Sequence, residues 1–313
     1  MTDTLKTPKR ERFNCPKCGR STTAPVGTRR LASRLCSPCF GKGTDRRPRE
    51  LNDLVGREWA QASRSVMEYP DTRSEKQRQH GASFPQSLAE HQIEIYTKAG
   101  DFVLDPFVGV GTTLDACGKL GRRGLGIDLN AEYLDLARAD LASPDLRVVQ
   151  DDARNLLTHV APDTVDLVLT SPPYGDLLKN VKGAFAYKWQ EHSEINAIHN
   201  PRPYSDDPQD LGNLPYDDFL EAVQAVFSAT RTALKPNSYA VWVVKDFRAV
   251  KQKVPYVNLH GDIANVGQAA GLTLWDIRIY DQTRFRPLVC LGFPSRNFYL
   301  NIGHSYILVF KKT

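Results

Sequence analysis

The chain has 313 residues, of which 41% are hydrophobic and 25% charged, and its net charge is +5. This suits a globular protein with one large and one smaller domain. No run of about 18 apolar residues occurs, so we expect no membrane-spanning helix and no membrane partner. The polar, basic N-terminus is not typical of a signal peptide. We therefore expect a cytoplasmic protein in a reducing compartment.

The positive charge is concentrated in residues 1–50. This segment carries 13 Lys and Arg against 4 Asp and Glu, a balance of +9, whereas the rest of the chain has a balance of −4. A basic module beside a nearly neutral body predicts a polyanionic partner, most simply nucleic acid. A solvated, solubilising tail is the alternative.

Two cysteine pairs lie in this basic segment, Cys15 with Cys18 and Cys36 with Cys39, and 17 residues separate the pairs. Each pair suits a tight turn that directs two thiolates at one ion. Four sulfurs in a tetrahedron suit a structural Zn²⁺, so the pattern predicts a zinc ribbon. Metal binding would then supply much of its stability. Disulfides are the alternative, which a reducing compartment disfavours.

The composition of residues 41–49, polar and basic with several Gly and Pro, predicts a linker. We therefore place the zinc ribbon and linker at residues 1–50 and a single larger domain at residues 51–313. Residues 51–66 have apolar side chains at helical spacing and predict a helix. The ribbon side chains expected to contact phosphates, if they are more than a solvated face, are Arg12, Lys17, Arg20, Arg29, Arg30 and Arg34.

A glycine-rich turn follows the first predicted strand of the larger domain, residues 102–104. Its sequence is Asp105-Pro106-Phe107-Val-Gly109-Val-Gly111-Thr112-Thr113. Glycines allow the backbone to approach a ligand closely. The helix that begins at Thr112 offers free N–H groups to a carboxylate. Upstream, His80-Gly-Ala-Ser83-Phe84-Pro85 precedes a helix predicted at residues 86–97.

Two further predicted strands end in acidic residues. Residues 124–128 end at Asp128, about 20 residues beyond the turn, where a carboxylate can accept both hydroxyls of a ribose. Capping a helix predicted at residues 131–142 is a second role for Asp128. Residues 146–152 form the next predicted strand, which ends at Asp151 and Asp152.

The fourth apolar strand, residues 165–169, leads into Thr170-Ser171-Pro172-Pro173-Tyr174. Each proline fixes φ and removes an N–H, so the nearby carbonyls have no local donor. Those carbonyls can accept from an outside amine, and Tyr174 can cover a flat ring. This corner suits the exocyclic amino group of a nucleobase, although the same residues also occur as a plain turn.

In this order, the glycine-rich turn, the acidic strand ends and the Ser-Pro-Pro-Tyr corner resemble the S-adenosylmethionine-dependent amino-methyltransferases of DNA. The resemblance covers about residues 51–313. It implies an α/β, Rossmann-like fold with a mostly parallel sheet flanked by helices. A helix at residues 216–234, a turn at residues 235–238, and strands at residues 239–244, 272–280 and 305–310 would complete it.

The resemblance also implies which residues bind the cofactor S-adenosylmethionine. An acid at the third strand end contacts the adenine amino group in this family; Asp152 aligns best, and Asp151 is the fallback. The remaining residues implied to bind the cofactor are His80, Ser83, Phe84, Pro85, Asp105, Pro106, Phe107, Gly109, Gly111, Thr112 and Asp128.

The same resemblance makes residues 171–174 catalytic. Ser171 Oγ and the Pro172 carbonyl would accept the amine hydrogens, Pro173 would complete the loop, and Tyr174 would stack on a base flipped out of duplex DNA. A serine at the first position favours N4 of cytosine over N6 of adenine in this family. Two further functions stay open: methylation of an RNA base, and nucleic-acid binding by the zinc ribbon without catalysis.

Target recognition must come from outside these motifs. The candidates are an insertion at residues 177–215, residues 283–301 with their arginines, and the zinc ribbon. The resemblance implies a link to restriction-modification, but the sequence does not reveal a partner nuclease, the target sequence or the oligomeric state.

Overall fold

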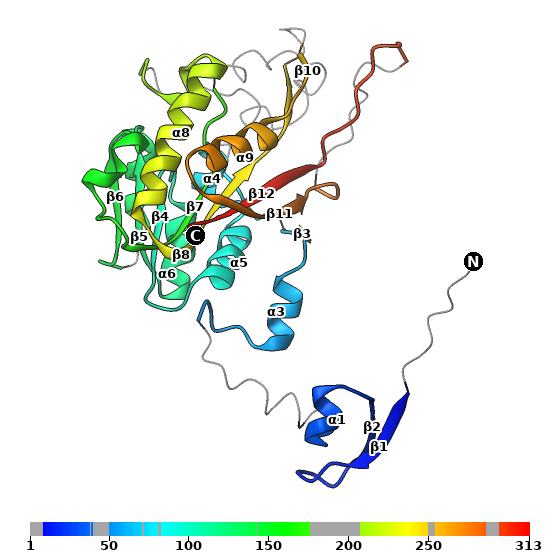
Figure 1. The fold of residues 1–313 in the computed structure, drawn as a ribbon. Coiled ribbons are helices and arrows are strands. Elements are labelled where there is room, and N and C mark those ends of the chain that lie inside the picture. The colour runs from blue at the N-terminus through cyan, green and yellow to red at the C-terminus, as the bar shows by residue number, and fades with distance from the viewer. Residues whose placement is uncertain are drawn as a thin grey trace. The chain divides into compact units, whose positions relative to one another are not determined.

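The computed structural model describes residues 9–37, 39, 50–70, 72–80, 83–141, 143–175, 207–249, 254–285 and 294–313. The predicted linker at residues 41–49 and most of the insertion predicted at residues 177–215 lie outside this part. The chain forms two compact units, Met1–Glu50 and Leu51–Thr313 (Figure 1).

The first unit is a small hairpin with one short helix. Strands β1 (Arg10–Asn14) and β2 (Ser21–Pro25) pair antiparallel, and α1 (Arg29–Ser33) follows them. Its buried apolar residues within the described part are few: Phe13, Cys15, Ala24 and Cys36. A core this small needs another source of stability.

The second unit contains an eight-stranded sheet in the order β3-β11-β12-β8-β7-β4-β5-β6. The strands are β3 (Val66–Glu68), β4 (Phe102–Asp105), β5 (Arg123–Asp128), β6 (Leu146–Gln150), β7 (Val165–Thr170), β8 (Leu234–Val244), β11 (Thr273–Asp281) and β12 (His304–Lys311). Strands β6, β5, β4, β7 and β8 run parallel, whereas β12 is antiparallel to both its neighbours. This confirms the predicted α/β, Rossmann-like fold. A separate hairpin, β9 (Phe247–Ala249) with β10 (Val254–Val257), follows β8.

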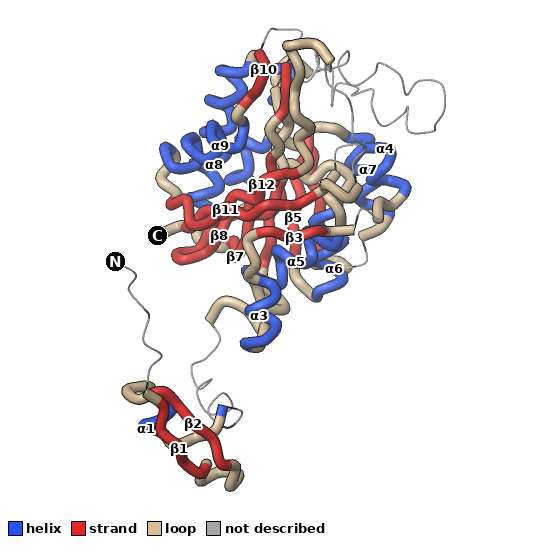
Figure 2. The backbone as a smooth tube through the Cα atoms, turned by 90° about the vertical axis from the view of Figure 1, so that its right-hand side faces the viewer, coloured by secondary structure: helices blue, strands red, loops and turns tan. Residues whose placement is uncertain are grey.

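Helices cover both faces of the sheet (Figure 2). They are α3 (Gly56–Ala62), α4 (Glu75–His80), α5 (Gln86–Tyr96), α6 (Thr112–Leu120), α7 (Ala131–Ala139), α8 (Tyr216–Ala233) and α9 (Leu259–Ala269), with the 3₁₀ turns η1 (Ala153–Thr158) and η4 (Leu211–Asn213). One apolar cluster joins α8 and α9 to the sheet, with Phe227 stacked on Trp242. A second cluster packs α5 and α6 on the other face. In the described part, no helix is long and apolar enough to span a bilayer.

The helix predicted at residues 51–66 is wrong in extent, because α3 spans only Gly56–Ala62 and Val66 begins β3. The cause lies far along the chain. The buried Arg278 guanidinium donates to the carbonyls of Ala62 and Arg64, and Ile279 N donates to Ser65 O. These bonds draw the segment alongside β11 as a strand.

Two other boundaries differ. Helix α7 ends at Ala139, before the predicted residue 142. Residues 235–238, predicted as a turn, lie within β8, where Asn237 has a positive φ of 66° and the pairing with β7 shifts register.

Candidate functional site

A cavity of about 270 Å³ opens at the carboxyl edge of the sheet. The predicted site residues that line it are His80, Ser83, Phe84, Pro85, Pro106, Phe107, Asp128, Asp151, Ser171, Pro172, Pro173 and Tyr174. The structure therefore brings together the glycine-rich turn, two acidic strand ends and the Ser-Pro-Pro-Tyr corner. Among the described residues, Asp105, Gly109, Gly111, Thr112 and Asp152 are not part of the lining.

The glycine-rich turn is closed by Asp128. The Gly109 N–H donates to Asp128 Oδ2 at 2.8 Å, and the Asn130 N–H donates to Oδ1 at 2.9 Å. Gly109 has a φ of +50°, and a β-carbon there would lie 2.8 Å from His80 Nε2. Burial raises the pKa of Asp128 to about 6. The carboxylate therefore shapes the turn as well as lining the cavity.

Asp105 points into the sheet. Its carboxylate accepts from Thr170 Oγ1 at 2.6 Å, from Thr113 Oγ1 at 2.5 Å and from the Phe107 N–H at 3.0 Å. Burial raises its pKa to about 6. Asp105 thus links the glycine-rich turn to the strand that leads into the Ser-Pro-Pro-Tyr corner.

The end of β6 directs Asp151 to the cavity. Asp152 lies at the N-terminus of η1, where it pairs with Arg154 and accepts from the Arg154 N–H. The Asp151 carboxylate lines the cavity, 2.6 Å from His159 Nε2 and bonded to Asn155. These side-chain hydrogen bonds, first that from Asn155, hold the pKa of Asp151 below its ordinary value. The geometry favours Asp151, the fallback assignment, over Asp152.

His80, the last residue of α4, lies against the glycine-rich turn. The His80 ring lies 4.5 Å from the Tyr133 ring, centroid to centroid, and its Nδ1 lies 3.3 Å from Ser83 Oγ. Burial lowers the pKa of His80 to about 4, so the imidazole is neutral near pH 7. His80 therefore adds no positive charge near Asp128 and Asp151.

Tyr174 stands against a second aromatic ring that sequence reasoning did not single out. The Tyr174 and Phe247 rings are parallel within 2°, with centroids 6.0 Å apart. Gly175 follows with a φ of +68°, a backbone conformation that favours glycine. The pair forms a flat aromatic wall.

A buried network holds Phe247 in place. Its neighbour Asp246 has no exposed side-chain surface and accepts from the His260 N–H at 3.0 Å. Asp246 Oδ2 also lies 2.8 Å from His260 Nδ1 and accepts from the Tyr256 hydroxyl. The His260 ring stacks on Tyr306, with centroids 3.7 Å apart. These contacts fix the β9–β10 hairpin beside the cavity.

Polar groups from β8, β11 and β12 form the far end of the cavity. Lys245 Nζ donates to Gln282 Oε1 at 2.9 Å, and Ser305 lines the same end. Sequence reasoning missed these residues, together with Arg73, Tyr133, Asp210 and Leu211. No local motif marks Lys245 or Gln282, because they meet through the pairing of β8 with β12 and of β12 with β11.

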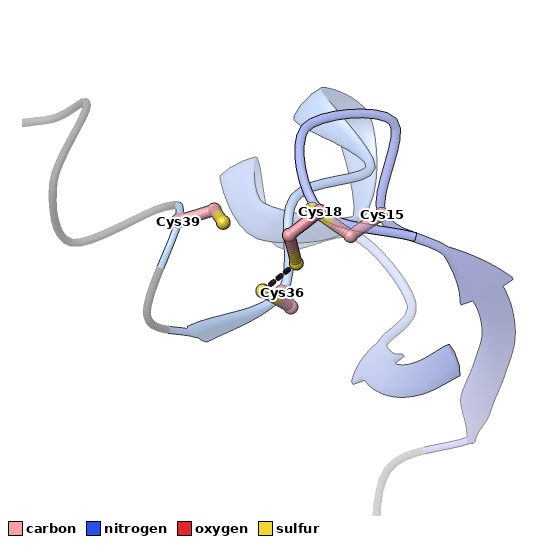
Figure 3. A group of neighbouring side chains, drawn as sticks. All are labelled: Cys15, Cys18, Cys36 and Cys39. Atoms are coloured by element: carbon pink, nitrogen blue, oxygen red, sulfur yellow. Dashed lines mark hydrogen bonds between the residues drawn. The ribbon is translucent and has the colours of Figure 1, made fainter. Parts of the chain in front are cut away.

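The four N-terminal cysteines converge on one point (Figure 3). Their sulfurs all lie within 4.8 Å of one another, and Cys18 and Cys36 are 3.4 Å apart. A tetrahedral Zn²⁺ with bonds near 2.3 Å needs sulfurs about 3.8 Å apart. All four are free thiols rather than disulfides. The donor set fits a structural zinc ion.

The pKa values of two of these thiols are shifted in opposite directions. A hydrogen bond from the Cys36 backbone lowers the pKa of Cys15 to about 6. Hydrogen bonds from the Cys39 S–H to the Cys36 and Cys18 sulfurs raise the pKa of Cys39 to about 12. Clustered thiols resist complete ionisation unless a cation balances their charge, which is what a metal supplies.

Comparison with known proteins gives one family match. Residues 40–139 match the family model described as DNA methylase, of the N6/N4 methyltransferase type. The chain is 50% identical over 62 residues to the type II methyltransferase M2.DpnII of Streptococcus pneumoniae, which is 20% of this chain and 23% of that protein.

An RNA enzyme is also similar. The chain is 38% identical over 81 residues to a tRNA (guanine(10)-N2)-dimethyltransferase of Methanothermobacter thermautotrophicus, covering 25% of this chain and 23% of that protein. The matches span between a fifth and a quarter of the length of these curated relatives. Among solved structures, TrmN of Thermus thermophilus aligns with a TM-score of 0.46 at 18% identity, over 76% of this chain and 52% of that one.

Proposed function

We propose, from the match of residues 40–139 to the N6/N4 DNA methylase family model, that this chain is an S-adenosylmethionine-dependent methyltransferase. Its substrate would be an exocyclic amino group of a DNA base, with N4 of cytosine favoured. The observation that carries the proposal is that one cavity contains both the Asp128 end of the glycine-rich turn and residues 171–174.

The acidic end of the cavity suits the cofactor. Asp128 and Asp151 present carboxylate acceptors, which match ribose hydroxyls and an adenine amino group. The aromatic ring of Phe107 and the neutral His80 beside Tyr133 give apolar walls. When bound there, S-adenosylmethionine supplies an electrophilic methyl group.

The catalytic corner would position the amine. Ser171 and the Pro172 carbonyl are assigned as acceptors for its two hydrogens, and Tyr174 as the surface on which the base stacks. Because a ring amine is a poor nucleophile, alignment and electrostatic stabilisation must supply most of the rate. In a duplex the base must first leave the stack.

Ser171 is the residue that favours cytosine. In the family that the sequence resembles, a serine at the first position of this motif accompanies methylation of N4 of cytosine, whereas Asp or Asn accompanies N6 of adenine. Adenine N6 is the alternative.

Methylation of an RNA base is the second candidate function, and the similarity to a tRNA dimethyltransferase favours it. A non-catalytic, nucleic-acid-binding zinc ribbon is less well supported, because the cavity joins the cofactor turn to the catalytic corner. We also propose that Zn²⁺ is the ion held by Cys15, Cys18, Cys36 and Cys39. The free thiols support a cytoplasmic location.

Tritiated S-adenosylmethionine tests the function. The protein is incubated with genomic duplex DNA or with total RNA, which are then digested to nucleosides. We expect label in N4-methylcytosine from DNA, none with Ser171→Ala, and wild-type incorporation with Trp275→Ala, an exposed residue outside the cavity lining. Label only in RNA would establish the alternative, and no label in either would refute methyl transfer to nucleic acid.

A further inference from the structure

Two stretches project from the same edge of the sheet as the cavity. Because β12 runs antiparallel to β8 and β11, its first residue lies at the edge where those strands end. The first stretch, residues 247–258, of which 247–249 and 254–258 are described, therefore begins there. The second, residues 282–303, of which 282–285 and 294–303 are described, begins and ends there. The Gln282 N–H donates to Gly303 O at 2.8 Å and closes the base of the second stretch. Figure 1 shows the described part of this stretch extending beyond β12.

The charged residues of these two stretches are all basic. In the sequence they contain six basic residues and no acidic residue, although residues 51–313 have a negative balance overall. Of the basic residues, Arg248, Arg284 and Arg296 lie in the described part. Arg284 is largely exposed and its partner is Glu68 at 3.2 Å. The described residues of these stretches therefore include three arginines and no acidic residue.

Arg248 clamps the two stretches together. Its guanidinium donates to Pro255 O at 2.8 Å and to Leu300 O at 2.9 Å. It also lies over two rings, 5.4 Å from the Tyr256 centroid and 5.2 Å from the Tyr299 centroid. The residues around Leu300 are thus fixed to the hairpin that carries Phe247.

This clamp leaves large apolar side chains in solvent. Tyr299 is half-buried against Arg248, whereas its neighbours Phe298 and Leu300 are 57% and 71% exposed. Phe285 and Tyr256 are each 41% exposed. Aromatic and apolar groups among arginines suit nucleic acid, where they stack on bases or enter the space between base pairs.

We propose that the described residues of these two stretches form the surface on which duplex DNA docks. Arg284 and Arg296 contact phosphates, while Phe298 and Leu300 enter the duplex beside the nucleotide that moves into the cavity. This inference rests on the proposed function. It assigns duplex opening to side chains that take no part in the chemistry.

The test compares paired and unpaired targets. Base-resolved sequencing of DNA methylated by the wild-type protein supplies the site, which is then made as a duplex and as the same duplex with the target base mismatched. Opening a paired site costs a few kcal/mol, so Phe298→Ala with Leu300→Ala should lower turnover on the paired duplex by roughly tenfold or more. On the mismatched duplex we expect turnover near that of the wild type. Equal loss on both, or no loss, would overturn the wedge role.

Fluorescence anisotropy on a short mixed-sequence duplex tests the arginines. Arg284→Ala with Arg296→Ala should reduce the slope of log affinity against log salt by about 0.9 for each phosphate that the protein no longer neutralises. Arg138→Ala, on α7, and Trp275→Ala, at the far end of β11, are the matched controls and should match the wild type. An unchanged slope in the double variant would refute the docking surface. A wild-type protein that binds this duplex but methylates no DNA would instead contradict the proposed function.

Discussion

Under the proposed function Tyr174 contacts the target base and Asp128 the cofactor, and substitutions should separate the two roles. Stacking on a base is worth about 1–3 kcal/mol, so Tyr174→Ala should lower turnover by roughly 5- to 150-fold with unchanged cofactor affinity. Tyr174→Phe keeps the ring against Phe247 and should retain most of the rate. Asp128→Ala should show the reverse pattern, with weakened cofactor binding in calorimetry. Cofactor affinity unchanged in Asp128→Ala would contradict the assignment.

Asp105 should make stability depend on pH. Burial raises its pKa from 3.8 to about 6. A raised folded-state pKa favours folding when the group is protonated, so that contribution is complete below about 3.8 and is lost as the pH rises through 6. The shift corresponds to about 3 kcal/mol. Urea unfolding measures the free energy of unfolding of the wild type and of Asp105→Asn. The difference between the two free energies should become smaller as the pH rises from 5 to 7.5. Parallel pH profiles for the two proteins would rule this out.

The residues that sequence reasoning identified lie in continuous motifs, where one strand and the turn after it determine the position. Lys245, Gln282 and Phe247 were not predictable in this way. The place of Lys245 and Gln282 in the cavity lining depends on which strands neighbour each other, and the place of Phe247 against Tyr174 depends on a buried network around Asp246. Asp105 shows a different limit, because a motif locates the residue but does not say which way its side chain points.

At the scale of elements, the contact between α4 and the glycine-rich turn makes a sharp prediction. Gly109→Ala combines a positive φ with a β-carbon 2.8 Å from His80 Nε2, so the His80 ring must shift. We expect cofactor affinity to fall by roughly tenfold, since left-handed backbone alone costs an alanine about 1–2 kcal/mol. Removing the ring in His80→Ala should make the added Gly109→Ala change less costly. Calorimetry of both single variants and the double variant measures this coupling, and strict additivity would argue against the contact.

Most strands were predictable because short apolar runs with polar ends define β4 to β7. The helix predicted at residues 51–66 was too long for a physical reason. The helical spacing of apolar residues was present, but a distant arginine determined where the helix ends. Arg278 satisfies the carbonyls that follow Ala62, and it lies more than two hundred residues away. Such long-range pairing has no local signature.

At the scale of the whole molecule, the two units should respond independently to metal removal. A chelator, or Cys36→Ser, should unfold only the first unit, because its few buried apolar residues do not suffice without the ion. We expect one zinc per chain by atomic absorption, and loss of that zinc should leave cofactor affinity unchanged. Cys117→Ser, a buried thiol of the second unit, should keep its zinc. A chain that holds no metal after purification with zinc would refute the ribbon.

The bonds of Thr113 and Thr170 to Asp105 also have a consequence for inheritance. One carboxylate receives a hydroxyl from the turn that faces the cofactor and another from the strand that leads to the catalytic corner. Neither motif can change alone at these positions, because a substitution in one leaves a buried polar group of the other without its hydrogen-bond partner. Descendants of this sequence should therefore change the three residues together or keep all of them, and grafting either motif alone into a distant homologue should fail until its partner is transferred as well.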